Sequence, residues 1–329
     1  MASDENAHKG DEKTGFGFHS TQASLTDDWQ DYALLDSGDG LKLERFGPYS
    51  FIRPEPQALW SKRLDDAIWQ KAAGRFVASS DDPEKGGRWH LSDKLPARWE
   101  MSFETIRFYA SPTPFRHLAF FPEQSAHWQF CADKIKTFKD IHGRAPRILN
   151  LFAYTGAASL HAAAAGAEVT HIDASKKAIA QAFENRDLSD LQQAPIRFIT
   201  DDCSKFVARE VRRENRYDGI ILDPPKYGRG PKGEVWRLEE TLPDLLQQCR
   251  SLLSDDAIFM VLTIYAIRTS TLAVHSAMAD ALNGRSGNLT SGELAIAEAQ
   301  DNPRAIGQAL FVRWENEALN AAPATIHKG

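Results

Sequence analysis

The stretch Asp218-Gly-Ile-Ile-Leu-Asp-Pro-Pro-Lys-Tyr-Gly228 is the most informative part of the sequence about the fold. Three aliphatic residues between a glycine and Asp-Pro-Pro predict a strand that is buried on both faces. The strand must end at Pro224, because prolines donate no hydrogen bond to a neighbouring strand and turn the chain outward. In an open parallel sheet, ligands bind beyond the carboxyl ends of the strands, so we expect Asp223 to face a site. Taken alone, the Asp-Pro-Pro motif is explained equally well by a purely structural turn.

The composition is that of a globular chain. Its 329 residues, 42% hydrophobic and 26% charged, are enough for two domains. No apolar run approaches the roughly 20 residues of a membrane span, and the charged segment Met1 to Lys13 is not a secretory signal. The three cysteines have no paired spacing, which disfavours disulfides and a metal site. We therefore expect a cytoplasmic protein with no membrane partner and no metal.

The first third of the chain predicts two regions. Residues 1–28 are rich in Asp, Glu, Lys, Ser and Gly with few aliphatics, which predicts a disordered tail. Residues 29–115 contain short strand-like runs separated by prolines and turns, with a short helix expected within Leu59 to Ala73. This predicts a small, mostly β domain that could contact substrate or RNA. Its many aromatic residues suit either base stacking or core packing.

Residues 116–329 predict a second domain with a different pattern of secondary structure. A helix is expected over Ser125 to Asp140, and from Arg147 onward strands and helices alternate regularly. The chain then ends in two strands with no helix between them. This order predicts an α/β fold: a Rossmann-like, doubly wound, mostly parallel seven-stranded sheet that ends in an antiparallel hairpin. The seven expected strands are Arg147 to Ala153, Glu168 to Ala174, Ile196 to Asp201, Tyr217 to Asp223, Ala257 to Tyr265, Leu289 to Ala299 and Ile306 to Trp314.

Polar residues follow the first four of these strands. The tight turn Asn150-Leu-Phe-Ala-Tyr-Thr-Gly156 opens a helix and allows close approach of a ligand, but it lacks the three glycines that bind a pyrophosphate. Asp173 follows about 20 residues later, where a carboxylate can accept hydrogen bonds from both ribose hydroxyls. Asp201-Asp202-Cys203 ends the third strand and could receive the exocyclic amine of adenine. Each acid alone is more often a helix cap or turn residue, but four such ends in sequence favour a site.

This pattern resembles the class I S-adenosylmethionine-dependent methyltransferases over about residues 117–315. Phe121-Pro-Glu-Gln124, Phe152-Ala-Tyr-Thr-Gly156, Asp173-Ala-Ser175 and Asp223-Pro-Pro-Lys226 look more narrowly like the bacterial large-subunit ribosomal RNA methyltransferases, in which a small β-rich domain precedes the catalytic one. The resemblance implies S-adenosylmethionine as cofactor and an acceptor site lined by Asp223, Pro224 and Lys226. The cofactor residues that it implies are Gln124, Asn150, Phe152, Ala153, Tyr154, Thr155, Gly156, Asp173, Ala174, Ser175, Asp202 and Cys203.

The expected reaction is methylation of a base nitrogen in ribosomal or other structured RNA. Family members that methylate carbon 5 of cytosine need a cysteine, and here Lys226 and Thr263-Ile-Tyr-Ala-Ile-Arg268 occupy the places where it is expected. We expect Tyr227 or Trp236 to stack on the base, although a structural Trp236 is equally compatible, and Arg229 with Lys226 to meet phosphate. Three glycines and four basic residues between Lys226 and Arg237 predict a mobile lid.

Two alternatives stay open at this point. Family members that act on ribosomal targets usually begin with an additional RNA-binding domain, which the stretch before Tyr32 is too short to form. Together with the net charge of −6, this allows a methyltransferase for a protein side chain or small molecule. The other alternative is a non-catalytic RNA-binding protein that keeps the fold. A homo-oligomer is compatible with either.

Overall fold

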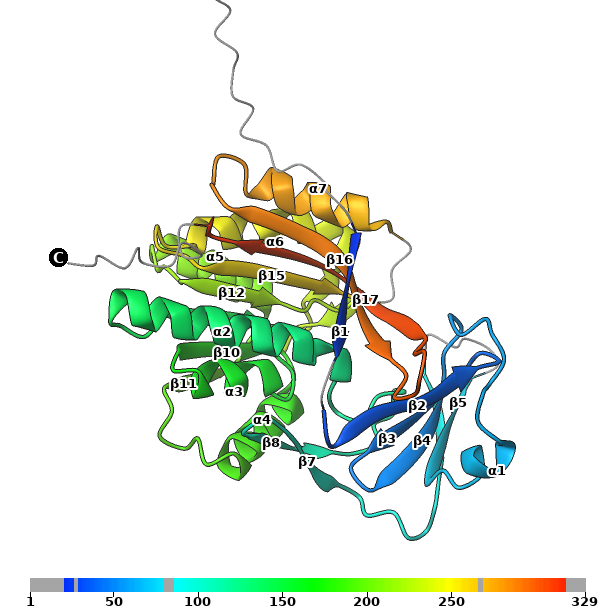
Figure 1. The fold of residues 1–329 in the computed structure, drawn as a ribbon. Helices are drawn as coiled ribbons and strands as arrows, with labels where there is room; N and C mark the ends of the chain where they lie inside the picture. The colour runs from blue at the N-terminus through cyan, green and yellow to red at the C-terminus, as the bar shows by residue number, and fades with distance from the viewer. Residues whose placement is uncertain (1–20, 27–28, 80–85, 266–268, 318–329) are drawn as a thin grey trace, which may run out of the picture.

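The computed structural model describes residues 21–26, 29–79, 86–265 and 269–317. Its main feature is an eight-stranded sheet with the order β1-β16-β17-β15-β12-β9-β10-β11. The central strands run parallel, and β17 runs antiparallel to both β15 and β16 (Figure 1). The strands are β1 Thr21–Thr26, β9 Arg147–Leu151, β10 Glu168–Asp173, β11 Ile196–Thr200, β12 Gly219–Leu222, β15 Phe259–Ile264, β16 Asn288–Ala297 and β17 Ala305–Glu315.

The predicted seven-stranded sheet with its terminal hairpin is confirmed, and β1 adds an eighth strand. Thr21–Thr26 lies in the stretch predicted to be disordered, so that prediction is wrong for these six residues. Residues 1–20 and 27–28 of the same prediction lie outside the described residues. β1 pairs in parallel with β16. Its backbone hydrogen bonds thus come from a strand at the other end of the chain, which local composition does not reveal.

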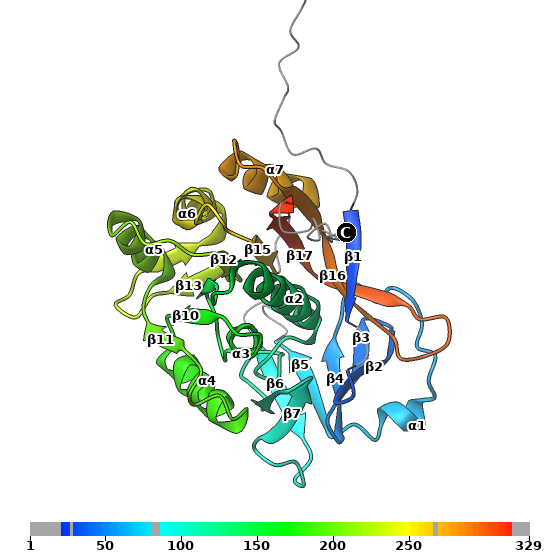
Figure 2. The same cartoon turned by 60° about the vertical axis from the view of Figure 1, so that its left-hand side comes forward.

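Helices cover both faces of this sheet (Figures 1 and 2). Successive residues of a strand point to opposite faces, and Ile148 and Ile221 accordingly pack with α2 and α3. Their neighbours Leu149 and Ile220 pack with α5, α6 and α7. The buried aliphatic runs of the sequence therefore form a sheet between two helical layers. The helices are α2 Ser125–His142, α3 Ala157–Ala164, α4 Lys176–Leu188, α5 Cys203–Arg212, α6 Leu238–Leu252 and α7 Thr271–Ala281.

A smaller β-rich part precedes this unit. It contains a five-stranded sheet and the separate hairpin β7-β8. The expected helix over Leu59 to Ala73 is only the single turn α1 Asp66–Trp69, and Leu59 itself is 89% exposed. The strands are β2 Tyr32–Gly38, β3 Leu41–Phe46, β4 Tyr49–Pro54, β5 Gly74–Ala78, β6 Gly87–Leu91, β7 Trp99–Phe103 and β8 Ile106–Ala110.

A shared aromatic core joins the two parts. Trp29, Phe46 and Phe108 of the small part pack in one cluster with Trp128 of α2 and Leu160 of α3. Rings of this cluster meet edge to face, as between Trp29 and Trp128 at 5.8 Å. The aromatic residues that suited either stacking or packing are therefore core residues in these cases. The division of the chain at residues 115 and 116 stays a prediction.

The tip of the terminal hairpin adds a polar link between the parts. Arg304 Nη2 lies 2.9 Å from Asp36 Oδ1 and 2.6 Å from Glu298 Oε1, and Ser37 Oγ donates to Glu298 at 2.5 Å. Both carboxylates are buried, so their pairing with Arg304 offsets the cost of removing them from water. The small sheet is thereby held against the edge where the parallel strands end.

Candidate active site

The turn after β9 is the most constrained backbone of the site. Phe152 and Tyr154 adopt positive φ angles of 57° and 49°, and Gly156 has φ 93°. Such a conformation costs a non-glycine residue about 1 kcal/mol or more, and it persists only where surrounding contacts impose it. Here the Phe152 N–H donates to Cys203 Sγ at 3.3 Å and the Tyr154 N–H to Asp173 Oδ2 at 2.9 Å. The strained turn lies between the carboxyl ends of β10 and β12, where the strand order reverses and ligands bind in such sheets.

The Asp173 carboxylate can accept more hydrogen bonds than its two backbone donors supply. Its Oδ2 accepts the Tyr154 N–H and its Oδ1 accepts the Ser175 N–H at 2.8 Å. A carboxylate offers about four lone-pair positions, so each oxygen can accept one more donor. Burial raises the pKa of Asp173, and the two backbone hydrogen bonds act against that rise. The partly exposed carboxylate is thus placed for a pair of hydroxyls.

Asp202 and Cys203, at the start of α5, have different structural roles. Asp202 Oδ1 caps α5 by accepting the Lys205 N–H at 2.9 Å, which leaves Oδ2 for another donor. The Cys203 thiol is buried and accepts the Phe152 N–H, so only its backbone can meet a ligand. The neighbouring Asp201 pairs with Arg209 on α5. Within the described part of the chain, both Asp201 oxygens have a hydrogen-bond partner and Asp202 Oδ2 has none.

Several predicted cofactor residues make hydrogen bonds that hold the turn after β9 in place. Asn150 is buried and its Nδ2 donates to Ser159 Oγ at 2.9 Å. The Thr155 hydroxyl donates to the Ala119 carbonyl at 2.8 Å, and the Thr155 carbonyl accepts from Asn185 Nδ2. These side chains hold the turn and present no group to a ligand. Ala153, Ala174 and Ser175 lie at the same strand ends, and the Ser175 hydroxyl caps α4 by accepting the Ala178 N–H.

Asp223 follows β12 and meets Gln124 at the end of the 3₁₀ helix η2 (Pro122–Gln124). Gln124 Nε2 donates to Asp223 Oδ2 and to Tyr265 Oη, each at 3.1 Å. Burial and, to a smaller extent, the nearby Glu123 carboxyl raise the pKa of Asp223 to about 8, and the Gln124 hydrogen bond opposes them with a smaller effect. Gln124, predicted to bind the cofactor, thus lies beside Asp223 and Pro224, which were predicted to line the acceptor site, and Tyr265 joins them. Their roles toward a ligand stay a prediction.

The segment predicted to be a lid forms a short hairpin, β13 Tyr227–Arg229 and β14 Val235–Arg237. Trp236 is only 4% exposed, its ring lies 4.9 Å from the Phe152 ring, and its Nε1 donates to the Pro225 carbonyl. The prediction that Trp236 stacks on a base does not fit this structure, because the ring fills the space beneath the Pro-Pro turn. Tyr227, Arg229 and Lys226 are exposed on the hairpin side.

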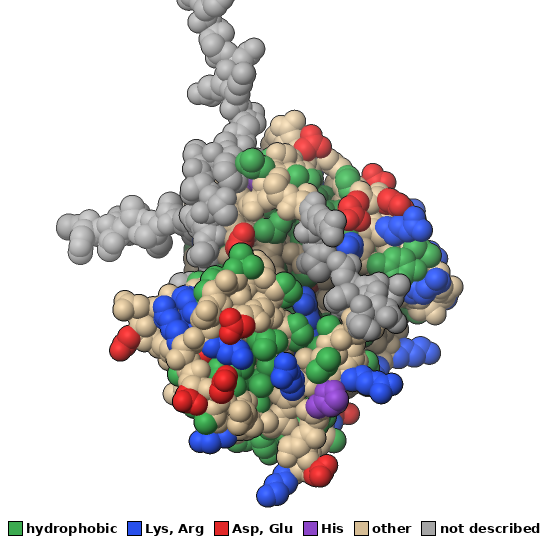
Figure 3. Space-filling model, turned by 90° about the vertical axis from the view of Figure 1, so that its right-hand side faces the viewer, with side chains coloured by type: hydrophobic (Ala, Val, Ile, Leu, Met, Phe, Trp, Pro, Cys, Tyr) green, Lys and Arg blue, Asp and Glu red, His purple; other side chains and the backbone are tan. Residues whose placement is uncertain are grey.

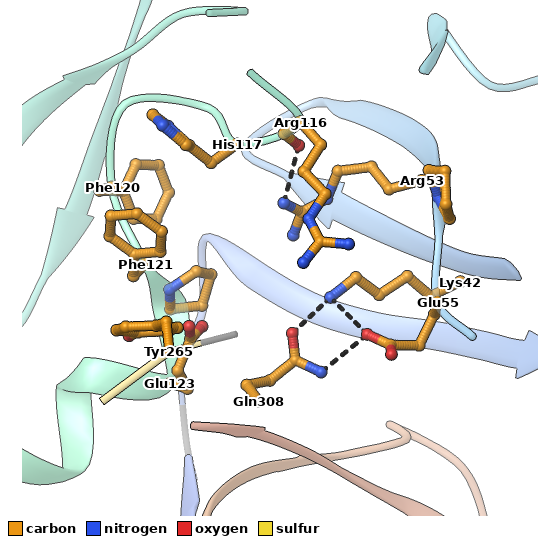
Figure 4. Close-up of a pocket in the computed structure, with 12 residues that line it drawn as sticks. Lys42, Arg53, Glu55, Arg116, His117, Phe120, Phe121, Glu123, Tyr265 and Gln308 are labelled. Atoms are coloured by element: carbon orange, nitrogen blue, oxygen red, sulfur yellow. Dashed lines mark hydrogen bonds and ion pairs between the residues drawn. The ribbon is translucent and has the colours of Figure 1, made fainter. Parts of the chain in front are cut away.

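A pocket of about 90 Å³ adjoins the acceptor side and contains residues that the sequence analysis did not single out (Figure 4). It lies between the small sheet and the segment around η2, and Tyr265 and Gln308 close it. Tyr265 was detectable in principle, since it directly follows the carboxyl end of β15. The other lining residues that were missed include Lys42, Arg53, Glu55, Arg116 and His117.

Three further features of the described residues concern metals, membranes and thiols. They contain no group of three or more His, Cys, Asp or Glu that could hold a metal ion. No helix among them has the length and apolarity needed to span a membrane. The cysteines Cys131, Cys203 and Cys249 are buried and unpaired, and burial raises the pKa of each thiol. Thiols in such surroundings are poor nucleophiles.

Comparison with known proteins identifies the family. The family model for S-adenosylmethionine-dependent methyltransferases matches residues 132–263. The crystal structure of a SAM-dependent methyltransferase from Agrobacterium tumefaciens is 44% identical, with a TM-score of 0.86 over 95% of this chain and 99% of that one. The structure of SMU.776 complexed with SAH, at 16% identity and TM-score 0.65 over 88% and 76% of the two chains, shares the fold.

Two curated relatives have names that refer to ribosomal RNA. The name of MJ1653 from Methanocaldococcus jannaschii assigns it to the ribosomal RNA large subunit methyltransferases. MJ1653 is 37% identical over 225 residues, which are 67% of this chain and 55% of MJ1653. The ribosomal RNA large subunit methyltransferase K/L of Shewanella sp. (strain ANA-3) is 40% identical over 90 residues, 27% of this chain and 13% of that protein. The chain thus spans about half of the first relative and a small part of the second. It belongs to the S-adenosylmethionine-dependent methyltransferases, and S-adenosylmethionine is its methyl donor.

Proposed function

We propose that this enzyme methylates a base nitrogen in ribosomal or other structured RNA. The observation that carries the proposal is the Asp223 carboxyl group, held by Gln124 beside a pocket at the strand ends, with no accessible thiol near it among the described residues. A nitrogen lone pair can attack the sulfonium methyl directly: the N–CH₃ bond forms as the S–CH₃ bond breaks, and the nitrogen's proton passes to the Asp223 carboxylate or to water. The protein then contributes mainly position and exclusion of water.

The names of the two ribosomal RNA relatives support an RNA substrate. The surface supports it as well. On the face shown in Figure 3, Lys and Arg side chains are spread among hydrophobic ones, although the net charge of the chain is negative. Basic groups meet phosphates and apolar groups meet bases when RNA binds.

The residues around the β9 turn fit the cofactor. Asp173 would accept both ribose hydroxyls, and Asp202 Oδ2 with the Cys203 backbone N–H would bind the adenine edge. The main chain of Phe152 to Gly156, which those side-chain contacts fix, would receive the methionine end together with Gln124. The chemistry that the cofactor supplies is an electrophilic methyl group on a sulfonium.

The test is methyl transfer from tritiated S-adenosylmethionine to total RNA and to total protein from a strain that lacks the gene. We expect label in the RNA fraction, and mass spectrometry of its nucleosides should show one methylated species that the deletion strain lacks. Label in protein or small molecules, with none in RNA, would replace this proposal by the alternative substrate class.

Asp173→Asn should weaken S-adenosylmethionine binding about ten- to a hundredfold, because hydrogen bonds to a charged acceptor contribute roughly 1.5–3 kcal/mol. Calorimetric titration of the folded variant measures this. Asp187→Asn, an exposed change on α4, is the matched control and should bind as the parent does. An affinity for Asp173→Asn equal to that of the control would refute the ribose role.

Replacing Lys226 and Arg229 by Ala should weaken RNA binding and flatten its salt dependence. The log–log slope should fall by about 0.7 for each phosphate of single-stranded RNA that no longer meets a cation. Cofactor affinity should not change, because neither side chain is among those expected to hold the cofactor. Filter binding at several salt concentrations measures the slope. Equal slopes for variant and parent would remove this hairpin from the RNA interface.

A variant with all three cysteines changed to Ser or Ala should keep methyl transfer, apart from a modest loss of stability. Direct attack by nitrogen needs no thiol, and a carbon-5 mechanism requires one. RNA that contains 5-fluorocytosine should form no covalent adduct with the parent protein. Loss of activity in a folded variant that still binds cofactor would overturn the nitrogen-acceptor proposal.

A further inference from the structure

The pocket beside Asp223 is built by two separated parts of the chain (Figure 4). Lys42 of β3 and Arg53 of β4 form the wall on the side of the small sheet. Glu123 of η2 and Tyr265 form the side that faces Asp223, with Gln124 bridging to it. Tyr265, which lines the pocket, is thus linked to Asp223 through Gln124.

Two of its cations are neutralised within the fold. Lys42 Nζ lies 3.2 Å from Glu55 Oε2 and donates to Gln308 Oε1 at 2.6 Å. Arg53 binds the Glu44 carboxylate through Nε and Nη2, both at 2.6 Å. Each of these cations thus has a carboxylate partner within the protein.

Arg116 is the exception. Its carbonyl accepts a hydrogen bond from Arg53 Nη1 at 3.0 Å, which fixes the backbone at this position. Its side chain is exposed and forms no hydrogen bond or ion pair with the residues that the structure describes. Figure 4 shows the guanidinium group directed into the pocket. A guanidinium offers parallel N–H donors that match two oxygens of a phosphate.

The interior suits a nucleobase. Tyr265 lines this pocket, and its hydroxyl accepts a hydrogen bond from Gln124 Nε2, which also donates to Asp223. The rings of His117 and Phe121 lie 4.9 Å apart on one side, and burial lowers the pKa of His117 to about 4, so this imidazole is neutral near pH 7. Burial also raises the pKa of Glu123, and the cations Lys42 and Arg53 act against that rise. A ring surface, neutral polar groups and one unpaired cation are what a nucleotide requires.

We infer that this pocket receives the acceptor nucleotide, with its base against Glu123 and Tyr265 and its phosphate on Arg116. The inference rests on the proposed function and makes it more specific. The enzyme recognises a base together with its phosphate, and a free nucleoside or a protein side chain lacks the group that Arg116 binds.

Binding of the four common ribonucleoside 5′-monophosphates and of the matching nucleosides tests the inference without knowledge of the RNA target. Calorimetry is done on the full chain saturated with S-adenosylhomocysteine. We expect at least one monophosphate to bind about ten- to a hundredfold more tightly than its nucleoside, as for a charge-assisted phosphate contact. Arg116→Ala should abolish that difference, and Arg116→Lys should keep part of it.

Arg212→Ala is the matched control, because Arg212 is an exposed arginine on α5, on the other face of the large sheet. It should bind monophosphates as the parent does. Equal affinities for monophosphate and nucleoside, or a difference that survives in Arg116→Ala, would overturn the inference even if the enzyme methylates RNA. Tighter binding of an acidic peptide than of any monophosphate would overturn it too. Conversely, Arg116-dependent binding of a monophosphate with no methylation of RNA would retain this pocket and reject the proposed RNA substrate.

Discussion

Asp223→Asn is expected to reduce methyl transfer about 10²- to 10⁴-fold, the range typical of a positioned proton acceptor. The asparagine keeps the size of the side chain and can still bond Gln124, but it cannot take a proton from the acceptor nitrogen. The parent should lose activity as the pH falls below about 8, because the raised pKa of Asp223 leaves less carboxylate there. The variant should lack that acidic limb. Initial rates between pH 5.5 and 9 measure both.

The same substitution is expected to stabilise the fold at alkaline pH. The folded pKa of Asp223, about 8, lies above its ordinary value of 3.8, so the folded state binds this proton more tightly than the unfolded chain. The stabilisation from the protonated carboxyl is complete below about pH 4 and is lost as the pH rises through 8. Above pH 8 the parent has the cost of a desolvated charge, at most about 6 kcal/mol for a shift of this size and less because Asp223 is partly exposed.

Urea unfolding of the cofactor-free protein at several pH values should therefore show Asp223→Asn gaining stability over the parent between pH 5 and 8. Asp187→Asn, whose carboxylate is half exposed, should run parallel to the parent throughout. If Asp223→Asn also ran parallel, the raised pKa would be wrong. If it gained stability but kept full activity, Asp223 would not be the proton acceptor.

Strand burial explains why the sheet was predictable. Ile148, Val169 and Ile221 lie on strands covered by helices on both sides, so their neighbours in sequence are apolar too and the runs are visible. β1 was not predictable because its partner β16 lies at the far end of the chain. A strand that depends on one edge for its hydrogen bonds needs no apolar run of its own.

Some residues of the site could likewise be placed from the sequence, and others could not. Asp173 and Asp223 could be placed together because the carboxyl ends of parallel strands share one edge. Trp236 could not be assigned, since its burial depends on contact with Phe152, and Asn150 turned inward because Ser159 offers it a partner. The pocket combines side chains from strands of both sheets, and no local pattern connects them.

The second large effect is on stability and concerns Arg53, which lines that pocket. Glu44 is fully buried, and it accepts two hydrogen bonds from Arg53 and one from Tyr32 Oη at 2.8 Å. Burial raises the pKa of Glu44, but the cations Arg53 and Lys42 and the hydrogen bonds outweigh it and lower this pKa to about 2. Arg53→Ala removes the main partner and leaves a buried carboxylate with one distant cation, Lys42 at 3.8 Å. We expect the free energy of unfolding at pH 7 to fall by about 3–5 kcal/mol, as for other broken buried pairs.

Two comparisons separate the loss of the pair from the loss of the side chain. Arg107→Ala breaks an exposed pair with Asp190 and should cost about 1 kcal/mol or less. The double change Glu44→Leu with Arg53→Met removes both charges and should recover much of the stability that Arg53→Ala loses, because no unpaired charge remains buried. A double variant as unstable as Arg53→Ala would mean that Arg53 acts through packing. Arg53 also donates to the Arg116 carbonyl and so fixes the backbone there. The stable double variant should therefore still bind nucleoside monophosphates less tightly than the parent. That result would connect the buried pair to the proposed phosphate contact.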